Sequence, residues 1–269
     1  MIFPVEFHVA VFGRSAVIPA HGVLEVLAYC VGFQTFLLLR RRAARSGDVQ
    51  NALPAEVVVW VIVGAVFGAL FGSKLLAWLE SARDYWAQRD NPAAWLGGKT
   101  IVGGLLGGWI GVEVVKHRMR ITRRTGDAFV IPLCLGIAIG RIGCFLTGLP
   151  DHTYGMATSL PWGVNFGDGI VRHPTQLYES IFALLLGLLL MALVLRRHHP
   201  AGDAFRWFVI AYLGFRFLVE FIKPSDKPLL GLSAIQVASL LGITAAAMSM
   251  SAFRTRPSDV MAGARGEQV

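Results

Sequence analysis

The sequence predicts an all-α fold: a polytopic bundle of about seven transmembrane helices, with the N-terminus outside and the C-terminus inside. Three observations lead to this prediction. Of the 269 residues, 55% are hydrophobic and only 16% are charged, whereas a soluble globular protein carries about 25% charged residues. Apolar runs recur along the chain at about the 20 residues that a spanning helix needs. Basic residues cluster in every second connection between these runs.

Seven apolar runs are the candidates for these spans, and each is long enough to cross the hydrocarbon layer of a bilayer as a helix. In chain order they are Ile18–Leu39, Glu56–Leu79, Leu96–Val115, Ala128–Gly148, Thr175–Leu195, Ala204–Ile222 and Ser233–Phe253. The segment before Ile18 is amphipathic and is expected on the membrane surface. Residues 1–254 are therefore expected to form a single transmembrane domain, and the short polar segment 255–269 a disordered cytoplasmic tail.

The distribution of basic residues sets the expected orientation, because arginine and lysine are enriched in cytoplasmic connections. Basic groups follow the first, third, fifth and seventh spans, so these connections are predicted to be cytoplasmic. The groups are Arg40, Arg41, Arg42 and Arg45; Lys116, Arg118, Arg120, Arg123 and Arg124; Arg196 and Arg197; Arg254 and Arg256. The formal net charge of +8 would also suit nucleic acid, but clusters confined to short connections between apolar runs argue against that partner.

Glycines at four-residue spacing predict that two of the spans pack closely. Small residues let helix backbones approach each other in lipid, where no hydrophobic effect drives helix association. They are Gly64, Gly68 and Gly72 in the second span, and Gly103, Gly107 and Gly111 in the third. The cysteines Cys30, Cys134 and Cys144 lie in apolar runs without metal-binding or CxxC spacing. We interpret them as buried apolar residues and expect no metal and no organic cofactor.

An arginine near the end of the fourth span is the first candidate functional residue. Arg141 lies in the string GRIGCFLTG, close to the predicted outer face, and a charged group at the mouth of an apolar span indicates a functional site. A guanidinium binds phosphate through two parallel hydrogen bonds, which suits a phospholipid head group. Gly140 and Gly143 leave space around it. The alternative is that Arg141 only extends toward the membrane interface.

The string HPTQLYE opens the fifth span. Proline is favoured at the first position of a helix, so Pro174 predicts that His173 is the N-cap. Helix N-termini attract anions, and Arg141 and this helix end are therefore expected to face one phosphate from two sides. His173 is also able to exchange a proton near neutral pH, and capping alone is the alternative role.

Arg216 and Glu220 lie four residues apart in GFRFLVEF and therefore on one face of the sixth span. Mutual neutralisation inside the bilayer would be enough to explain them. The functional alternative is an arginine that the carboxylate holds ready for a reacting phosphate. Glu179 is a second acid that would compete for the same arginine.

With GRIGCFLTG, HPTQLYE and FRFLVEF in this order, the sequence resembles bacterial prolipoprotein diacylglyceryl transferases, from about His21 to about Gln236. The resemblance implies transfer of the diacylglyceryl group from phosphatidylglycerol to the lipobox cysteine thiol of a prolipoprotein. The products would be a thioether-linked prolipoprotein and glycerol phosphate. It also implies that membrane lipid and prolipoprotein signal peptides are the partners, and that the protein is a multi-pass protein of the bacterial cytoplasmic (inner) membrane.

By motif position, Arg141 resembles the signature arginine of the family and Arg216 the second arginine implicated in catalysis. Other matching positions, which the resemblance assigns to substrate binding or to catalysis, are His173, Gln176, Tyr178, Glu179 and Glu220. The sequence departs from the family pattern at several sites. They are Val102, where the family commonly has a histidine proposed to activate the thiol; Cys144, in place of asparagine; Leu149, in place of glutamate, with Asp151 and His152 nearby; and His21, in place of tyrosine.

These departures leave the general base open. His173 is the first candidate and His152, in the same predicted outer connection, is the second. They also keep two alternative functions open. One is a non-catalytic paralogue that binds lipid or lipoprotein, for which Val102 is the argument. The other is a small-solute transporter, with Arg216, Glu220 and Glu113 along the path of the solute.

Overall fold

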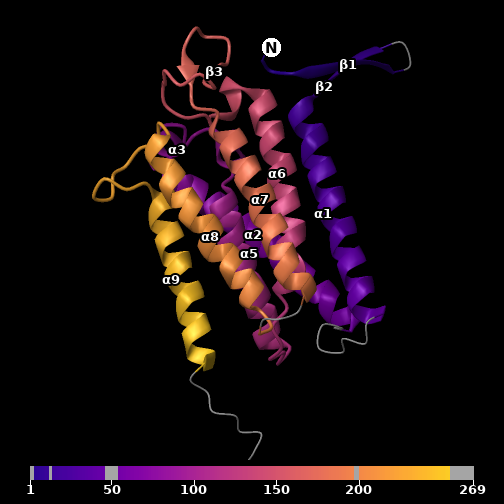
Figure 1. Ribbon diagram of the computed structural model, residues 1–269. Helices are drawn as coiled ribbons and strands as arrows, with labels where there is room; N and C mark the ends of the chain where they lie inside the picture. Colours follow the sequence, from indigo (N-terminus) through magenta and orange to yellow (C-terminus); the bar gives the residue numbers. More distant parts are fainter. Residues whose placement is uncertain (1–2, 12–13, 46–53, 197–199, 255–269) are drawn as a thin grey trace, which may run out of the picture.

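The computed structural model describes residues 3–11, 14–45, 54–196 and 200–254, and its long helices lie side by side in one bundle (Figure 1). The long helices are α1 (Ala20–Arg45), α2 (Ala55–Glu80), α5 (Ile101–Arg118), α6 (Asp127–Thr147), α7 (Thr175–Arg196), α8 (Asp203–Val219) and α9 (Ala234–Arg254). Four of them, α1, α2, α6 and α7, are long and apolar enough to cross a membrane, and α9 contains a shorter apolar helical stretch. The predicted polytopic helical bundle is confirmed in this coarser form.

The prediction of an all-α fold was wrong at two places. Strands β1 (Glu6–Val11) and β2 (Arg14–Pro19) form an antiparallel hairpin, with Glu6 opposite Pro19. This segment was expected to be amphipathic and to lie on the membrane surface; that placement stays a prediction, and the structure shows that the segment forms strands. The hairpin is attached to the bundle because the Val5 N–H donates to the Leu146 carbonyl at 2.9 Å and the Val5 carbonyl accepts from the Ala20 N–H at 3.0 Å.

A second, shorter hairpin lies in the connection between α6 and α7. Strands β3 (Val164–Asn165) and β4 (Val171–Arg172) pair antiparallel. The Asn165 side chain closes the loop between them, because its Oδ1 accepts the N–H groups of Gly167 and Gly169 at 2.8 and 3.1 Å. Both glycines have positive φ, a conformation that glycine adopts without a steric penalty. Figure 1 shows this connection at the end of the bundle where α6 ends and α7 begins.

The third predicted span begins later than expected. Short helices α3 (Ala82–Ala87) and α4 (Pro92–Leu96) precede it, and α5 begins at Ile101 instead of Leu96. Two contacts explain the break. Lys74 donates hydrogen bonds to the carbonyls of Leu96, Gly97 and Gly98, which draws those groups out of a helix. The Thr100 hydroxyl then accepts the Gly103 N–H at 3.2 Å, as an N-cap does.

The glycines at four-residue spacing bring α2 and α5 into backbone contact, as predicted. A Cβ atom added at Gly64 would lie 2.8 Å from the Gly111 carbonyl oxygen, and one at Gly68 or Gly72 would lie closer still to the carbonyls of Gly107 and Gly103. Real Cβ atoms do not approach so closely, so only glycine fits along this contact. We call these six residues the glycine seam.

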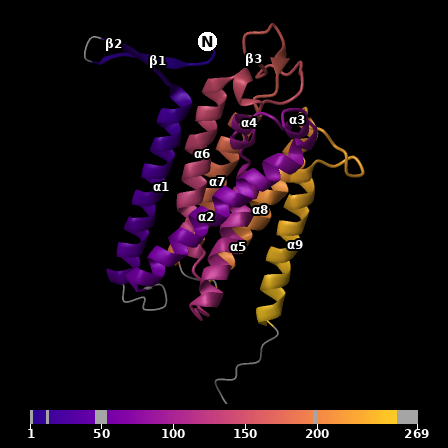
Figure 2. The same ribbon diagram turned by 180° about the vertical axis from the view of Figure 1, so that it is seen from behind.

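The remaining helices enclose an apolar core and leave an apolar surface. Val130, Phe208, Val209 and Leu213 are among its fully buried members, contributed by α6 and α8. Large apolar side chains on the outer faces of α2 and α7 are exposed, as expected of surfaces that face lipid. Figure 2 shows α2 crossing the back of the bundle beside α5, with α9 at one side and α1 at the other.

Candidate active site

A buried carboxylate holds two arginines at the end of the bundle where α6 ends and α7 begins. Glu179, in the first turns of α7, is 2% exposed. Its Oε2 lies 2.9 Å from Arg141 Nε and 2.9 Å from Arg216 Nη1, and its Oε1 accepts the Tyr212 hydroxyl at 2.6 Å. Arg141 and Arg216 are 6% and 3% exposed. One carboxylate of α7 therefore joins α6 and α8 around two cations.

The predicted pairing of Arg216 with Glu220 is confirmed. Arg216 Nη2 donates to Glu220 Oε2 at 3.1 Å, and both groups are buried. Glu220 begins a short 3₁₀ turn, η2 (Glu220–Ile222), that follows α8. The expected competition by Glu179 is present as well, so Arg216 lies between two carboxylates. The four charges cancel, which permits their burial.

Several polar atoms of this cluster have no hydrogen-bond partner among the described residues. They are Arg141 Nε, Arg216 Nε, and both Nε2 and Oε1 of Gln176. Arg141 Nε is close to Glu179, but its N–H is not directed at that oxygen. Gln176 is 1% exposed and lies three residues before Glu179, on the same face of α7. An unsatisfied buried polar group costs about 1–3 kcal/mol, so these donors favour a ligand with several acceptor oxygens.

The N-cap prediction for His173 was wrong. Helix α7 begins at Thr175, and the His173 carbonyl accepts the N–H groups of Gly155 and Thr175 at 2.8 and 2.9 Å. Its side chain lies with Tyr178 instead, Nδ1 to hydroxyl at 3.2 Å, and Trp162 donates to the same hydroxyl at 2.8 Å. His173 and Tyr178 thus contact each other, and Tyr178 directly precedes Glu179 in α7.

Gly143 and His21 lie at the contact between α6 and α1, whereas Gly140 faces open space. A Cβ at Gly140 would meet nothing within 4 Å, whereas one at Gly143 would lie 3.4 Å from His21 Nδ1. Gly143 therefore allows His21 to approach the helix that carries Arg141. His21 Nε2 is 3.6 Å from Glu25 Oε2, and Glu25 is paired with Lys99 at 2.5 Å. The role of Gly140 in leaving space for a substrate stays a prediction.

Comparison with known proteins matches this sequence to one family. Residues 15–252 match the family model described as prolipoprotein diacylglyceryl transferase. The chain belongs to the prolipoprotein diacylglyceryl transferase family. It is similar to proteins named phosphatidylglycerol–prolipoprotein diacylglyceryl transferase from three bacteria. The protein of Geobacter sulfurreducens is 37% identical, over 76% of this chain and 78% of its own length. The protein of Bordetella bronchiseptica is 32% identical, over 88% of this chain and 87% of its own length. The protein of Nitratidesulfovibrio vulgaris (strain Miyazaki F) is 38% identical, over 76% of this chain and 77% of its own length.

The positions at which this chain departs from the family pattern lie in different surroundings, and of those that the structure describes Cys144 contacts the arginine cluster. Val102 is 1% exposed and belongs to the apolar core, so no titratable group replaces the histidine at that position. Cys144 Sγ accepts a hydrogen bond from Arg141 Nη1 at 3.7 Å. His152, the second candidate base, is exposed and its ring lies 6.5 Å from that of Tyr154. Among the described contacts, none joins His152 to the arginines.

Sequence reasoning missed two members of the site of this transferase-family protein. Tyr212 lies four residues before Arg216, which lies four before Glu220, so the spacing places all three on one helix face. That regularity was a usable signal. Lys223 follows the sixth span directly and is 8% exposed. Burial, and after it the charge of Arg216, lowers the pKa of Lys223 to about 8, so a third cation lies beside the two arginines.

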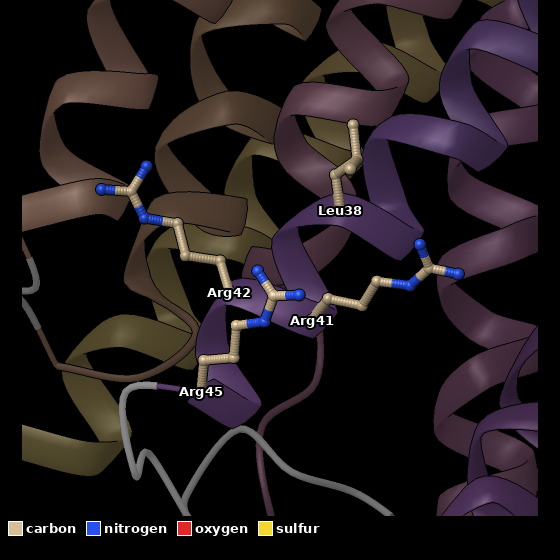
Figure 3. Close-up of a pocket in the computed structure, with 4 residues that line it drawn as sticks. All are labelled: Leu38, Arg41, Arg42 and Arg45. Carbon is tan, nitrogen blue, oxygen red and sulfur yellow. The ribbon is translucent and has the colours of Figure 1, made fainter.

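The opposite end of the bundle carries a different group of arginines. Figure 3 shows an open depression lined by Leu38, Arg41, Arg42 and Arg45, at the end of α1. The three arginines are exposed, and their guanidinium groups point apart in Figure 3. Glu113, which a transporter would place along a solute path, pairs instead with Lys116 near the end of α5, at 2.8 Å. No described contact joins that pair to Arg216 and Glu220.

Proposed function

We propose that this protein transfers the diacylglyceryl group of phosphatidylglycerol to the lipobox cysteine thiol of prolipoproteins, with Arg141 and Arg216 at the lipid phosphate. The observation that carries the proposal is the pair of buried arginines fixed on Glu179, in which the Nε donors of both guanidinium groups have no hydrogen-bond partner among the described residues. A planar guanidinium matches the oxygens of a phosphate diester. The substrates named for the relatives have such a phosphate and a thiol.

The reaction needs a thiolate and a stabilised leaving group. The acceptor sulfur attacks the glycerol carbon that bears the phosphate, a carbon–sulfur bond forms, and the carbon–oxygen bond to phosphate breaks. Glycerol phosphate leaves with the electron pair, and Arg141 and Arg216 stabilise its developing charge. The Gln176 amide is buried and has no partner among the residues that the structure describes, and it donates to the same head group. Glu179 and Glu220 position the arginines, Gly140 leaves room for the lipid, and Gly143 lets His21 approach α6.

His173 is the proposed acceptor of the thiol proton. Histidine exchanges protons near neutral pH, and the contact of Nδ1 with Tyr178 fixes the ring, so Nε2 is the atom that receives the proton. Tyr178 is thereby a positioning residue. His21, at the first turn of α1, lies where acceptor peptide and lipid would meet.

We also propose the placement of the protein in the membrane. Residues 1–254 form a single domain with about seven spans in the bacterial cytoplasmic (inner) membrane, with the N-terminus outside. The basic ends of α1 and α5 lie at the end opposite the β3–β4 connection in both views (Figures 1 and 2), which supports this orientation. The active site would then open at the outer face. The proposed cytoplasmic tail, 255–269, lies outside the described residues.

One observation favours a second function, a non-catalytic paralogue that binds lipid or lipoprotein. Val102 is buried and apolar where the family commonly has a histidine. Two measurements separate the candidates: rescue of lipoprotein lipidation in cells depleted of their own transferase, and transfer by purified protein given phosphatidylglycerol and a lipobox peptide. We expect rescue and a thioether-linked product. Normal expression without rescue or product would favour the paralogue.

A further inference from the structure

Three side chains with metal-ligand chemistry converge beside Arg141. They are His21 in the first turn of α1, Cys144 in the last turns of α6, and Asp151 in the 3₁₀ turn η1 (Leu149–Asp151). One ligand atom of each lies within 4.8 Å of the other two, and all three residues are partly buried. The residues are separated in the sequence, which is why no metal-binding spacing was visible and no metal was expected.

The ring of His21 is placed like that of a metal ligand. Its Nδ1 is buried and has no hydrogen-bond partner in the part of the chain that the structure describes. It lies 3.4 Å from the Cβ position of Gly143, so it faces the helix that carries Cys144. Its other nitrogen, Nε2, lies 3.6 Å from Glu25 Oε2. A metal-binding histidine typically directs its second nitrogen at a carboxylate in this way. Lys99 in turn holds Glu25.

The other two ligands are positioned by neighbours as well. The Thr153 hydroxyl donates to the Asp151 carboxylate, and Arg141 Nη1 donates to Cys144 Sγ at 3.7 Å. These neighbours orient a carboxylate and a sulfur toward the same point.

Charge around the group is also compatible with a divalent cation. Arg141 is already neutralised by Glu179, and Lys99 by Glu25. The thiolate of Cys144 and the carboxylate of Asp151 therefore remain to balance two positive charges. Nitrogen, sulfur and oxygen ligands together suit zinc.

We propose that His21, Cys144 and Asp151 bind a zinc ion, and that its remaining coordination position binds the acceptor cysteine as a thiolate. This inference rests on the proposed transfer function and deepens it. Three protein ligands and one exchangeable position are the pattern of catalytic zinc sites. A thiol that coordinates zinc loses its proton, and metal coordination is one of the ways in which enzymes activate a nucleophile. The zinc thus activates the acceptor thiol, which the Val102 side chain is unable to do.

The step balances without an oxidant or a reductant. The sulfur–hydrogen bond of the acceptor breaks on coordination, and the proton goes to His173. The bound sulfur then forms the carbon–sulfur bond, and the carbon–oxygen bond of the lipid breaks, with its electron pair going to the phosphate of glycerol phosphate. Zinc keeps its charge throughout.

Cobalt substitution tests the metal site directly, because a cobalt–thiolate bond absorbs in the near ultraviolet. Full-length protein in detergent, stripped with a chelator, is titrated with Co²⁺. We expect the absorption to saturate at one equivalent and to be absent in Cys144→Ser. His21→Ala and Asp151→Asn should weaken binding by roughly tenfold or more. The control, Cys30→Ser, changes a thiol exposed on α1 and should leave the titration unchanged.

The bound thiolate has its own measurement. A lipobox peptide added to the cobalt-loaded protein should raise the absorption to about twice its value, and the same peptide with serine for cysteine should not. X-ray absorption of the zinc-loaded parent should show one sulfur among nitrogen and oxygen neighbours, which keeps the test valid if a variant does not fold. Transfer should fall at least tenfold on chelation and return with zinc.

The outcomes separate the two proposals. A parent without the cobalt–thiolate absorption, or a Cys144→Ser variant that retains it, overturns the metal site. A metal that binds but gives no response to the peptide, or whose removal leaves transfer unchanged, overturns its role in thiol activation. A parent that binds metal and peptide as expected but transfers no lipid contradicts the proposed transfer function and leaves the site standing.

Discussion

The two ends of the bundle use arginine in opposite ways. At one end Arg141 and Arg216 are buried, and Glu179 and Glu220 fix their positions. At the other end Arg41 and Arg45 are exposed at the end of α1, around an open depression (Figure 3). A fixed guanidinium has already lost its conformational freedom and its water, so it stabilises a developing charge without reorganisation. An exposed one supplies charge alone. Burial and pairing with a carboxylate therefore decide whether an arginine in this bundle is able to stabilise a developing charge.

The largest effect is expected from changing the shape of a buried cation while its charge is kept. Arg141→Lys should lower transfer by about a thousand-fold, because lysine lacks the planar pair of donors that matches phosphate. Arg41→Lys is the matched control and should transfer at the parental rate. Both are measured with purified protein, phosphatidylglycerol and a lipobox peptide. Equal transfer rates for the two variants would contradict a catalytic role for the buried Arg141 that the exposed Arg41 lacks.

His173 sharpens the comparison, because it lies at the buried end but contacts Tyr178. His173→Gln keeps hydrogen bonding and loses proton exchange, so transfer at pH 7 should fall by about a hundred-fold. The loss should shrink as pH rises, since more of the acceptor thiol then ionises unaided. His152→Gln, at an exposed ring, is the control. A deficit that is constant across pH would assign His173 to placement of the lipid.

Charge pairing and phosphate binding are separated by a double variant. Arg216→Ala strands two acids, and removing one partner of a buried pair costs about 3–5 kcal/mol, so the amount of folded protein in membranes should drop. Glu220→Ala should lower it as well. In Arg216→Ala/Glu220→Ala we expect expression to recover but transfer to stay low. Recovered transfer would mean that Arg216 serves only to neutralise Glu220.

The smallest expected effect concerns Lys223. Its pKa in the folded protein is about 8, below the ordinary value of 10.5, so between these pH values the unfolded chain binds more protons. The free energy of unfolding should therefore rise with pH through this window, by on the order of 3 kcal/mol at most. Lys223→Met should remove the rise, measured by thermal unfolding in detergent at pH 7 and 10. The control is Lys227→Met, because the Lys227 ammonium lies over the Phe221 ring, and this variant should keep the rise in unfolding free energy. A rise that survives in Lys223→Met would contradict its assignment to Lys223.

Features that depend on local sequence were predictable. Hydrophobic run length located α2, α6 and α7 to within two residues at each end, because lipid imposes one length on every span. Helical spacing alone gave the Arg216–Glu220 pair and the glycine seam. In contrast, the start of α5 depended on Lys74, which is distant in the sequence and removes carbonyls from the helix.

Features that depend on which helices become neighbours were not predictable from residues alone. The meeting of His21, Cys144 and Asp151 requires α1 to pack on α6 and the chain to turn back after Thr147. The N-cap prediction for His173 used only the preference of proline for the start of a helix. In the structure the His173 carbonyl accepts the Gly155 N–H, and its ring contacts the Tyr178 hydroxyl. The errors at α5 and at His173 arose where contacts from outside the helix outweighed a local preference.

The glycine seam also limits how this enzyme can vary. Carbonyl oxygens of one helix occupy the space that a side chain would need on the other, so the backbones alone set the separation of α2 and α5. In an ordinary core a larger residue is accommodated by a smaller neighbour, but no smaller neighbour exists here. Lipid-facing positions such as Phe67 and Leu70 are free to drift among apolar residues, whereas Gly68 has no substitute. Substitutions in α2 should therefore be tolerated on its outer surface and excluded at the three glycines that contact α5.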